Sequence, residues 1–290
     1  MKQIYIEDSE GLSIKIHDIE DATCVYSVKR PIEGLEFPAI RTGQYTNAGA
    51  DGINIVSQYL GERRVQLTGF VSGLSSSAFV GARQTFLAAL RPKYSATGLL
   101  VDKWLRMTAM DGNTYRLLGE VVGATMPNEY LTYSEFAIDF LANSNVIESY
   151  TLHTETINTR TFGGFILPVD VPIVFAGGGG LTKIINNAGG ATAYPVLTFY
   201  GPLTTPRLMN TTTSKIMSLA TTIAAGQSIT VKMLNRTITQ GGTTNKMYTM
   251  STDSSFWGMP SGDNIFSLNS TVSGEAGYVT VEWRDAYAGI

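Results

Sequence analysis

The sequence contains few of the residues that carry most metal and nucleophilic chemistry. Among its 290 residues there is one cysteine, Cys24, and there are two histidines, His17 and His153. A single cysteine excludes an intrachain disulfide framework and a cysteine-rich zinc or iron–sulfur site. The histidines do not stand at metal-ligand spacing and no G-x-S-x-G motif accompanies them, so the sequence predicts no metal site and no triad hydrolase. We expect both histidines to be solvated, His17 on the polar face of a strand and His153 in a linker.

Charge is also scarce, since Asp, Glu, Lys and Arg make up 16% of the chain, where ~25% is typical. The 21 basic and 24 acidic residues give a formal net charge of −3, so no global positive field attracts nucleic acid or an anionic membrane. Two prolines, an aspartate and a run of four consecutive glycines interrupt the longest apolar stretch, residues 162–181, and we expect no membrane insertion. Glu7 and Asp8 stand where a secretion signal needs apolar residues, so we expect synthesis in a reducing cytoplasm.

The residues that are abundant favour β-structure. The chain is 43% hydrophobic and contains 30 glycines, and its many threonines prefer strands and turns over helices. The two halves differ in composition: residues 1–145 contain 29 charged residues and 10 threonines, whereas residues 146–290 contain 16 and 24. Two domains with different surfaces explain this shift, and a polar, threonine-rich stretch after Asn143 marks the boundary. We therefore predict domains at residues 1–145 and 146–290.

Alternation of apolar and polar residues predicts strands in both halves. In the first half it occurs at residues 12–16, 65–68 and 136–140. In the second half, strand-like runs bounded by Gly, Pro, Asn or Asp occur at residues 196–200, 228–232 and 278–283. Short strands at this spacing predict a β-sandwich for the second half.

Helical spacing of apolar residues is found in the first half, where Phe79, Phe86 and Leu90 recur on one face. Serines precede this segment and Arg91-Pro92 follows it, which are start and stop signals for a helix. We predict one amphipathic helix at about 78–91. The glycine-bearing segment 41–52 has little periodicity, and we expect a long loop there that suits a contact with a partner.

Candidate functional residues are few. Gly177 to Gly180 lack the Gly-Lys-Ser/Thr continuation of a phosphate loop and predict a turn, and no pair of carboxylates stands out for glycoside hydrolysis. We therefore predict no catalytic, cofactor-binding or metal-binding residue. Arg63 and Arg64 open a strand and could meet acidic groups of a neighbouring subunit. Trp257, beside a turn, could hold a sugar ring.

The order of several landmarks resembles that of siphophage distal tail proteins. Each landmark alone is a weak turn or strand signal, and their succession over most of the chain carries the resemblance. In the first half they are Gly61-Glu62-Arg63-Arg64-Val65-Gln66-Leu67-Thr68-Gly69, then Arg83, Phe86, Leu87, Leu90 and Arg91-Pro92. In the second half they are Asn187-Ala188-Gly189, Tyr194 to Leu197, Gly201, Asn210 with Thr211 to Thr213, Gly226 to Val231, Pro260 to Ile265 and Trp283 to Tyr287.

The resemblance implies a mainly β protein with a split β-barrel-like N-terminal domain, which carries the helix, and a galectin-like C-terminal β-sandwich. It implies a structural virion protein at the tail tip of a long-tailed, non-contractile phage. The N-terminal domains would form a homohexameric ring that joins the tail tube protein to the baseplate hub or tail fibre, with DNA passing through the lumen. The C-terminal domain would face outward, where a receptor-binding protein or a host glycan can be its partner. No enzymatic activity is implied, and assembly would take place in the bacterial host cytoplasm.

Three alternatives stay open from the sequence. The second domain could be a carbohydrate-binding module that contacts the host cell wall through an aromatic such as Trp257. The chain could instead be a wall-degrading tail hydrolase, which its residues favour least. A tail tube protein would also account for the first domain, but such proteins do not usually carry a full second sandwich.

Overall fold

The computed structural model describes the chain apart from residues 22, 50, 128–129, 160–181 and 273. The apolar stretch at 162–181 and the glycines at 177–180 therefore lie outside the described residues. The chain forms two compact units, the first made of Met1–Tyr150 with Tyr287–Ile290, and the second of Thr151–Ala286. The chain thus leaves the first unit after Tyr150 and returns to it at Tyr287.

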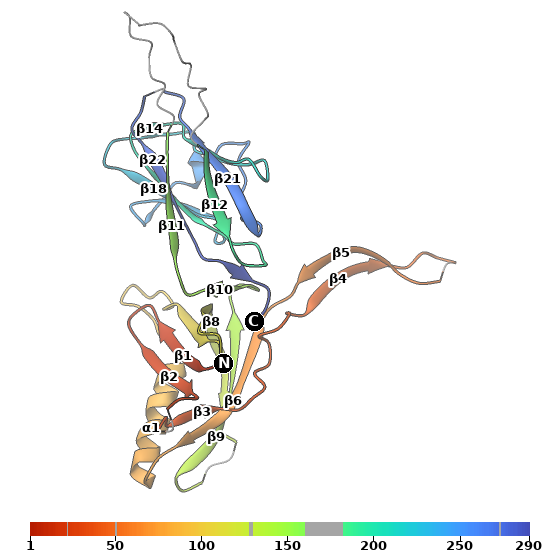
Figure 1. Ribbon diagram of the computed structural model, residues 1–290, viewed down its shortest axis with the longest axis vertical. Helices are drawn as coiled ribbons and strands as arrows, with labels where there is room; N and C mark the ends of the chain where they lie inside the picture. Colours follow the sequence, from red (N-terminus) through yellow and green to blue (C-terminus); the bar gives the residue numbers. More distant parts are fainter. Residues whose placement is uncertain (22, 50, 128–129, 160–181, 273) are drawn as a thin grey trace, which may run out of the picture. The chain divides into compact units, whose positions relative to one another are not determined.

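One large antiparallel sheet dominates the first unit, with its strands in the order β2-β1-β7-β8-β9-β6-β3 and β10 also paired to β8. The sheet curls into a nearly closed barrel, as Figure 1 shows. Its strands are β1 (Gln3–Asp8), β2 (Ser13–Asp18), β3 (Tyr26–Val28), β6 (Arg64–Ser72), β7 (Lys103–Thr108), β8 (Thr114–Thr125), β9 (Tyr133–Ala142) and β10 (Ile147–Ser149). The strands predicted at 12–16, 65–68 and 136–140 are confirmed as β2, β6 and β9.

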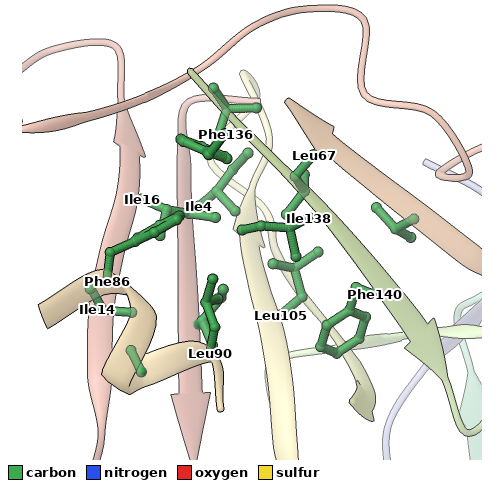
Figure 2. Close-up of a cluster of buried hydrophobic side chains, with 14 of the residues drawn as sticks. Ile4, Ile14, Ile16, Leu67, Phe86, Leu90, Leu105, Phe136, Ile138 and Phe140 are labelled. Atoms are coloured by element: carbon green, nitrogen blue, oxygen red, sulfur yellow. The ribbon is translucent and has the colours of Figure 1, made fainter. Parts of the chain in front are cut away.

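The core of the first unit follows from the alternation along these strands. On β6 and β9 every second residue is buried, which places Val65, Leu67, Phe136, Ile138 and Phe140 inside the barrel. Figure 2 shows these strands and the helix contributing side chains to one apolar cluster. Burying a large apolar side chain contributes ~1.5–3 kcal/mol, so this cluster is the main source of stability of the unit.

The helix α1 (Ser76–Leu90) confirms the prediction of a single amphipathic helix, two residues earlier at its start. Ser75 caps it, because its hydroxyl accepts a hydrogen bond from the Ala78 N–H at 3.2 Å. Phe79 and Phe86 are buried, and the Phe86 ring lies 4.8 Å from that of Phe136. The helix therefore adds its apolar face to the barrel core (Figure 2).

The segment between β3 and β6 differs from its prediction. Instead of a long loop, β4 (Ile40–Tyr45) and β5 (Asn54–Leu60) pair into an antiparallel hairpin. Every residue of β4 is exposed, and so are most of β5. Because neither face of this hairpin is buried within the chain, the sequence has no reason to alternate there, and the strand signal is absent.

The second unit is a β-sandwich. A six-stranded sheet in the order β11-β22-β13-β18-β19-β20 and a four-stranded sheet in the order β12-β21-β15-β16 supply its main layers, with β14 and β17 as a further pair. Its strands are β11 (His153–Asn158), β12 (Thr182–Asn187), β13 (Val196–Tyr200), β14 (Leu203–Thr204), β15 (Arg207–Asn210), β16 (Lys215–Ser218), β17 (Thr222–Ile223), β18 (Ser228–Lys232), β19 (Thr237–Gln240), β20 (Thr244–Asn245), β21 (Gly262–Asn269) and β22 (Tyr278–Trp283), with the short 3₁₀ helix η1 at Met247–Thr249. The last strand of the chain, β23 (Ala286–Tyr287), pairs with β10 in the large sheet of the first unit.

The core of the second unit uses the same alternation. Leu197, Phe199, Val279 and Val281 are fully buried on neighbouring strands of the six-stranded sheet. Trp283 is also buried, and its Nε1–H donates to the Asn186 carbonyl at 3.2 Å. The predicted fold class, a mainly β chain with a barrel-like unit and a sandwich, is confirmed. Among the described residues no helix has the length and apolar character needed to cross a bilayer.

Candidate functional site

Exposed apolar side chains are concentrated on the β4–β5 hairpin, which we call the hairpin arm (residues 40–60). In Figure 1 the arm extends away from the other strands of the first unit. Six of its apolar side chains are at least half exposed: Ile40 51%, Tyr45 52%, Ile53 55%, Ile55 57%, Val56 69% and Tyr59 65%. A group of apolar side chains of this size on a soluble protein is typical of an interaction surface.

Arg63 and Arg64, predicted to meet a neighbouring subunit, have different surroundings. The Arg63 side chain is 1% exposed, and burial lowers the pKa of its guanidinium. Its Nη1 donates to the carbonyls of Gly34 at 2.7 Å and Glu36 at 2.8 Å. Its Nε donates to Asn145 at 3.1 Å, and its Nη2 donates to the Ala288 carbonyl. Arg63 therefore joins three segments of the first unit.

Arg64 is the member of the pair that faces solvent. Its side chain is 49% exposed and lies 3.5 Å from the Glu62 carboxylate, a surface ion pair worth little in stability. A subunit contact through this pair stays a prediction, and in the described structure only Arg64 has a side chain at the surface to make one.

Trp257 is 5% exposed, and its ring lies 5.7 Å from that of Phe266. A stacking contact needs an open ring face, which Trp257 does not offer in this structure. The glycan contact predicted for Trp257 stays a prediction. The exposed aromatic residue beside it is Tyr194, which lines the same surface pocket and is 42% exposed.

The expectation of two solvated histidines is wrong for His17. This residue is 9% exposed, and its Nδ1 accepts a hydrogen bond from the Val28 N–H at 3.2 Å. The bond links the edge strands β2 and β3, so the imidazole bridges the gap where the barrel does not close. His153 remains partly exposed, stacks on Trp283 and lies 3.3 Å from the Asp285 carboxylate.

His17 should make the stability of the first unit depend on pH. Burial, then the nearby Arg30 and amino terminus, lower the pKa of His17, while Asp18 has the opposite effect. An imidazolium has no acceptor at Nδ1, so protonation also breaks the bond from Val28. Below about pH 6.5 His17 therefore binds a proton in the unfolded chain more readily than in the folded chain.

We expect the free energy of unfolding to be insensitive to His17 above that pH and to fall as the pH decreases, by at most about 1.4 kcal/mol per pH unit. Urea denaturation between pH 5 and 8 measures this slope. His17→Asn, which keeps an acceptor and cannot be protonated, should flatten it. An unchanged slope in His17→Asn would show that other groups cause the dependence.

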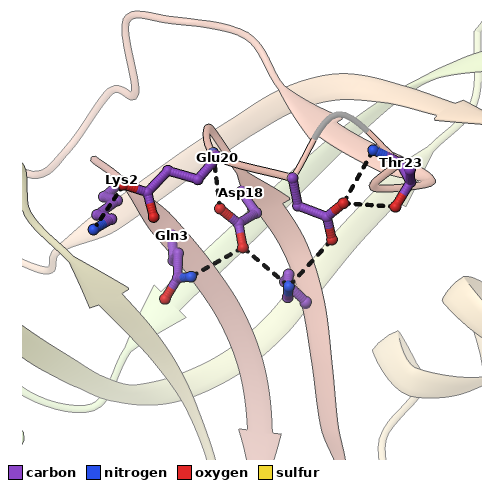
Figure 3. A network of polar contacts seen from close by, with 7 residues as sticks. Lys2, Gln3, Asp18, Glu20 and Thr23 are labelled. Carbon is purple, nitrogen blue, oxygen red and sulfur yellow. Dashed lines mark hydrogen bonds and ion pairs between the residues drawn. The ribbon is translucent and has the colours of Figure 1, made fainter.

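The edge strand β2 carries a network of charges, shown in Figure 3. The Asp18 carboxylate accepts from the Lys15 ammonium and from the Gln3 amide, both at 2.9 Å. The hydrogen bond from Lys15 is the main reason that the pKa of Asp18 is lowered. Charges on an edge strand oppose pairing with a further strand, so this edge is a poor candidate for an assembly contact.

Three of the landmarks in the second unit contain a buried asparagine, and Asn187 is the first of them. The Asn187 side chain is fully buried, donates to the carbonyls of Ala191 at 2.8 Å and Met259 at 3.2 Å, and accepts from the N–H groups of Gly189 and Ala286. A Cβ atom on Gly189 would lie 2.0 Å from the Ala286 carbonyl oxygen, so only glycine fits.

The buried amides of the other two landmarks, Asn210 and Asn264, are hydrogen-bonded to each other. The Asn210 side chain donates to the Asn264 side chain at 3.0 Å, and the Asn264 amide donates in turn to the carbonyls of Pro260 and Gly262. These amides fix the ends of β15 and β21. The side chains of these three asparagines are thus structural, because they hold turns in place.

The described residues offer no metal centre. Across them, no three His, Cys, Asp or Glu side chains are grouped closely enough to hold an ion.

Comparison with known proteins points to a phage tail. The family described as the siphovirus-type tail component, C-terminal domain, matches residues 188–287, which contain the buried asparagines Asn210 and Asn264. The chain is also similar in structure to the phage SPP1 Dit protein, described as a paradigm of the hub adsorption apparatus in phages that infect Gram-positive bacteria. The alignment covers 98% of each chain, with a TM-score of 0.64 and 13% sequence identity. Residues 188–287 are thus a siphovirus-type tail component domain, and the whole chain has the fold of the Dit protein.

Two further structures share the distal tail protein fold. They are the phage P2 baseplate in its activated conformation with Ca and with Sr, and each covers 97% of both chains with a TM-score of 0.50 at 10% identity. No curated protein matches the sequence. With the matched domain at residues 188–287, the chain is a tail component of a bacteriophage.

Proposed function

We propose that this distal tail protein forms a homohexameric ring at the tail tip, which joins the tail tube protein to the baseplate hub or tail fibre. The hairpin arm is the observation that carries the proposal. Exposure of its apolar side chains to water is unfavourable, and burial against a partner removes that cost. A second copy of the chain is a partner of suitable chemistry. A contact between unlike surfaces that repeats around an axis closes into a ring.

The area available on the arm suits such a contact. A stable subunit interface buries upwards of ~1,000 Å² in total. The arm contributes two strands with apolar residues on both faces, together with backbone groups at its strand edges that can pair with a neighbouring sheet. We infer that the first unit forms the ring and that the second unit carries further contacts.

The remaining parts of the proposal follow from the ring. DNA would pass through its lumen without specific contacts, in keeping with a net charge of −3. A ring subunit needs no reacting group, so we propose no enzymatic activity, and a turnover assay on purified cell wall should release neither sugar nor peptide. Assembly would take place in the host cytoplasm before incorporation into the virion.

Charged substitutions on the arm should dissociate the ring. Val56→Asp combined with Tyr59→Asp places two charges in the proposed contact without touching the core, because these side chains are 69% and 65% exposed. We expect light scattering to give about six times the 31.3 kDa chain mass for the wild type, and the mass of one chain for the double variant.

The control is Leu74→Asp, which alters a fully exposed apolar residue of the same unit outside the arm and should keep the ring. Calorimetry of each variant separates loss of assembly from loss of folding. A wild-type protein that is monomeric at tens of micromolar and forms no six-fold ring in micrographs of isolated tail tips would contradict the proposal. A double variant that still assembles would remove the arm from it.

A further inference from the structure

A pocket of about 400 Å³ opens on the second unit, where turns from both sheets come together. Lys215 and Arg236 reach it from the β15–β16 and β18–β19 turns, and Tyr194 precedes β13. Phe256 and Trp257 come from the segment before β21, and Leu234 completes this part of the lining. Loops gathered at one end of a sandwich are a frequent location for binding sites.

The pocket has uncompensated positive charge. Its lining includes Lys215 and Arg236 and no acidic residue. In the part of the chain that the structure describes, neither cation takes part in a salt bridge, unlike Lys183 and Arg207 of the same unit. Two cations that share a pocket and lack a carboxylate favour an anionic group between them.

Arg236 has an unusual backbone conformation for a residue with a side chain. Its φ is 53°, in the left-handed region that glycine occupies at least cost. Ser214, in the other turn beside the pocket, has a φ of 56°. Strained conformations of this kind are frequent at ligand-binding sites, so the backbone of Arg236 agrees with a role for this pocket.

The rest of the lining is apolar and partly open. Tyr194 is 42% exposed and Leu234 is 40% exposed, whereas Trp257 is buried in the wall. An aromatic ring beside an aliphatic side chain offers a flat apolar surface, which suits the C–H face of a sugar ring. A site that combines such a surface with two free cations suits a sugar that also carries an acid.

We propose that this pocket binds an acidic saccharide, with the sugar ring against Tyr194 and Leu234 and its phosphate or carboxylate at Lys215 and Arg236. The second unit would thus bind ligands of one chemical class. This proposal does not depend on the ring proposed for the first unit. The ligand could be part of a cell-surface polymer or a free sugar phosphate, which share this chemistry.

Titration calorimetry on the full-length protein tests the proposal. The probes are glucose 6-phosphate, glucose and inorganic phosphate, together with galacturonate and polygalacturonate. We expect saturable binding of glucose 6-phosphate or galacturonate at least about tenfold tighter than binding of glucose or phosphate, since each charge-assisted hydrogen bond is worth about tenfold or more. Tighter binding of the polymer than of its monomer identifies a surface glycan as the source, and equal binding identifies a small free ligand.

Arg236→Gly is the decisive variant, because glycine accepts the left-handed conformation without strain. It should weaken binding at least about tenfold while the melting temperature stays the same or rises. Arg236→Lys should retain much of the affinity. Lys246→Ala removes a half-buried cation of the same unit outside the pocket and should leave binding unchanged.

Three results would overturn the proposal: no saturable binding of any acidic sugar, equal affinity for inorganic phosphate, or unchanged binding in Arg236→Gly. Light scattering of the same samples reports the ring separately. Loss of sugar binding in an intact ring, or a monomer that still binds sugar, therefore distinguishes failure of one proposal from failure of the other.

Discussion

Replacing Arg63 by methionine is expected to destabilise the first unit by about 3–5 kcal/mol. Methionine fills a similar volume without polar atoms, and leaves the carbonyls of Gly34, Glu36, Asn145 and Ala288 without their donor. Each buried group left without a partner costs about 1–3 kcal/mol. Scanning calorimetry should show a lower transition temperature for the first unit.

The neighbouring arginine provides the control. Arg64→Met alters the same residue type one position along the chain, where the side chain is half exposed and its ion pair with Glu62 is long. We expect a change within about 0.5 kcal/mol. Equal effects of the two substitutions would show that the hydrogen bonds of Arg63 do not hold the segments together.

The second large effect is expected for Asn187→Leu, at about 3–4 kcal/mol in the second unit. Leucine has nearly the same shape but makes none of the four hydrogen bonds of the amide. The Ala191 carbonyl and two N–H groups lose this partner, and the Met259 carbonyl keeps only the hydrogen bond from the Ala193 N–H. The transition of the second unit should move to lower temperature while that of the first unit stays in place.

Asn186→Leu is the matched control for this change. Its amide is at the surface and bonds to the Asp263 carboxylate at 2.7 Å, where water can replace the lost contact. We expect a loss below about 1 kcal/mol. A loss as large as that of Asn187→Leu would contradict the assignment of the buried amide as the element that holds the turn.

The parts of the fold that the sequence predicts are those where one face of an element is buried. The alternation along β6 and β9 and the helical spacing of Phe79 and Phe86 exist because these residues line the core. The hairpin arm is a pair of strands without that constraint, so its sequence does not show a period of two. Its contact with a partner was nevertheless expected from the glycine-bearing segment.

The individual residues were harder to predict, because their surroundings come from distant parts of the chain. His17 alternates with apolar residues like a solvated side chain, and its burial depends on the arrival of Val28 from another strand. Arginine is usually found at the surface, so the sequence does not indicate that Arg63 is buried. Its hydrogen-bond acceptors are spread along the chain from Gly34 to Ala288. The pocket at Arg236 has no local motif at all, since its lining comes from four separate segments.

The path of the chain through its two units sets an order on folding. Residues 287–290 belong to the first unit but follow the whole second unit in sequence. A ribosome adds ~5–20 residues per second, so making Thr151–Ala286 separates Tyr150 from Tyr287 by several seconds or more. During that interval the Arg63 guanidinium lacks its Ala288 acceptor, and the first unit lacks residues 287–290. The second unit is complete once Ala286 has been made, so the first unit obtains its full set of contacts last although its sequence begins earlier.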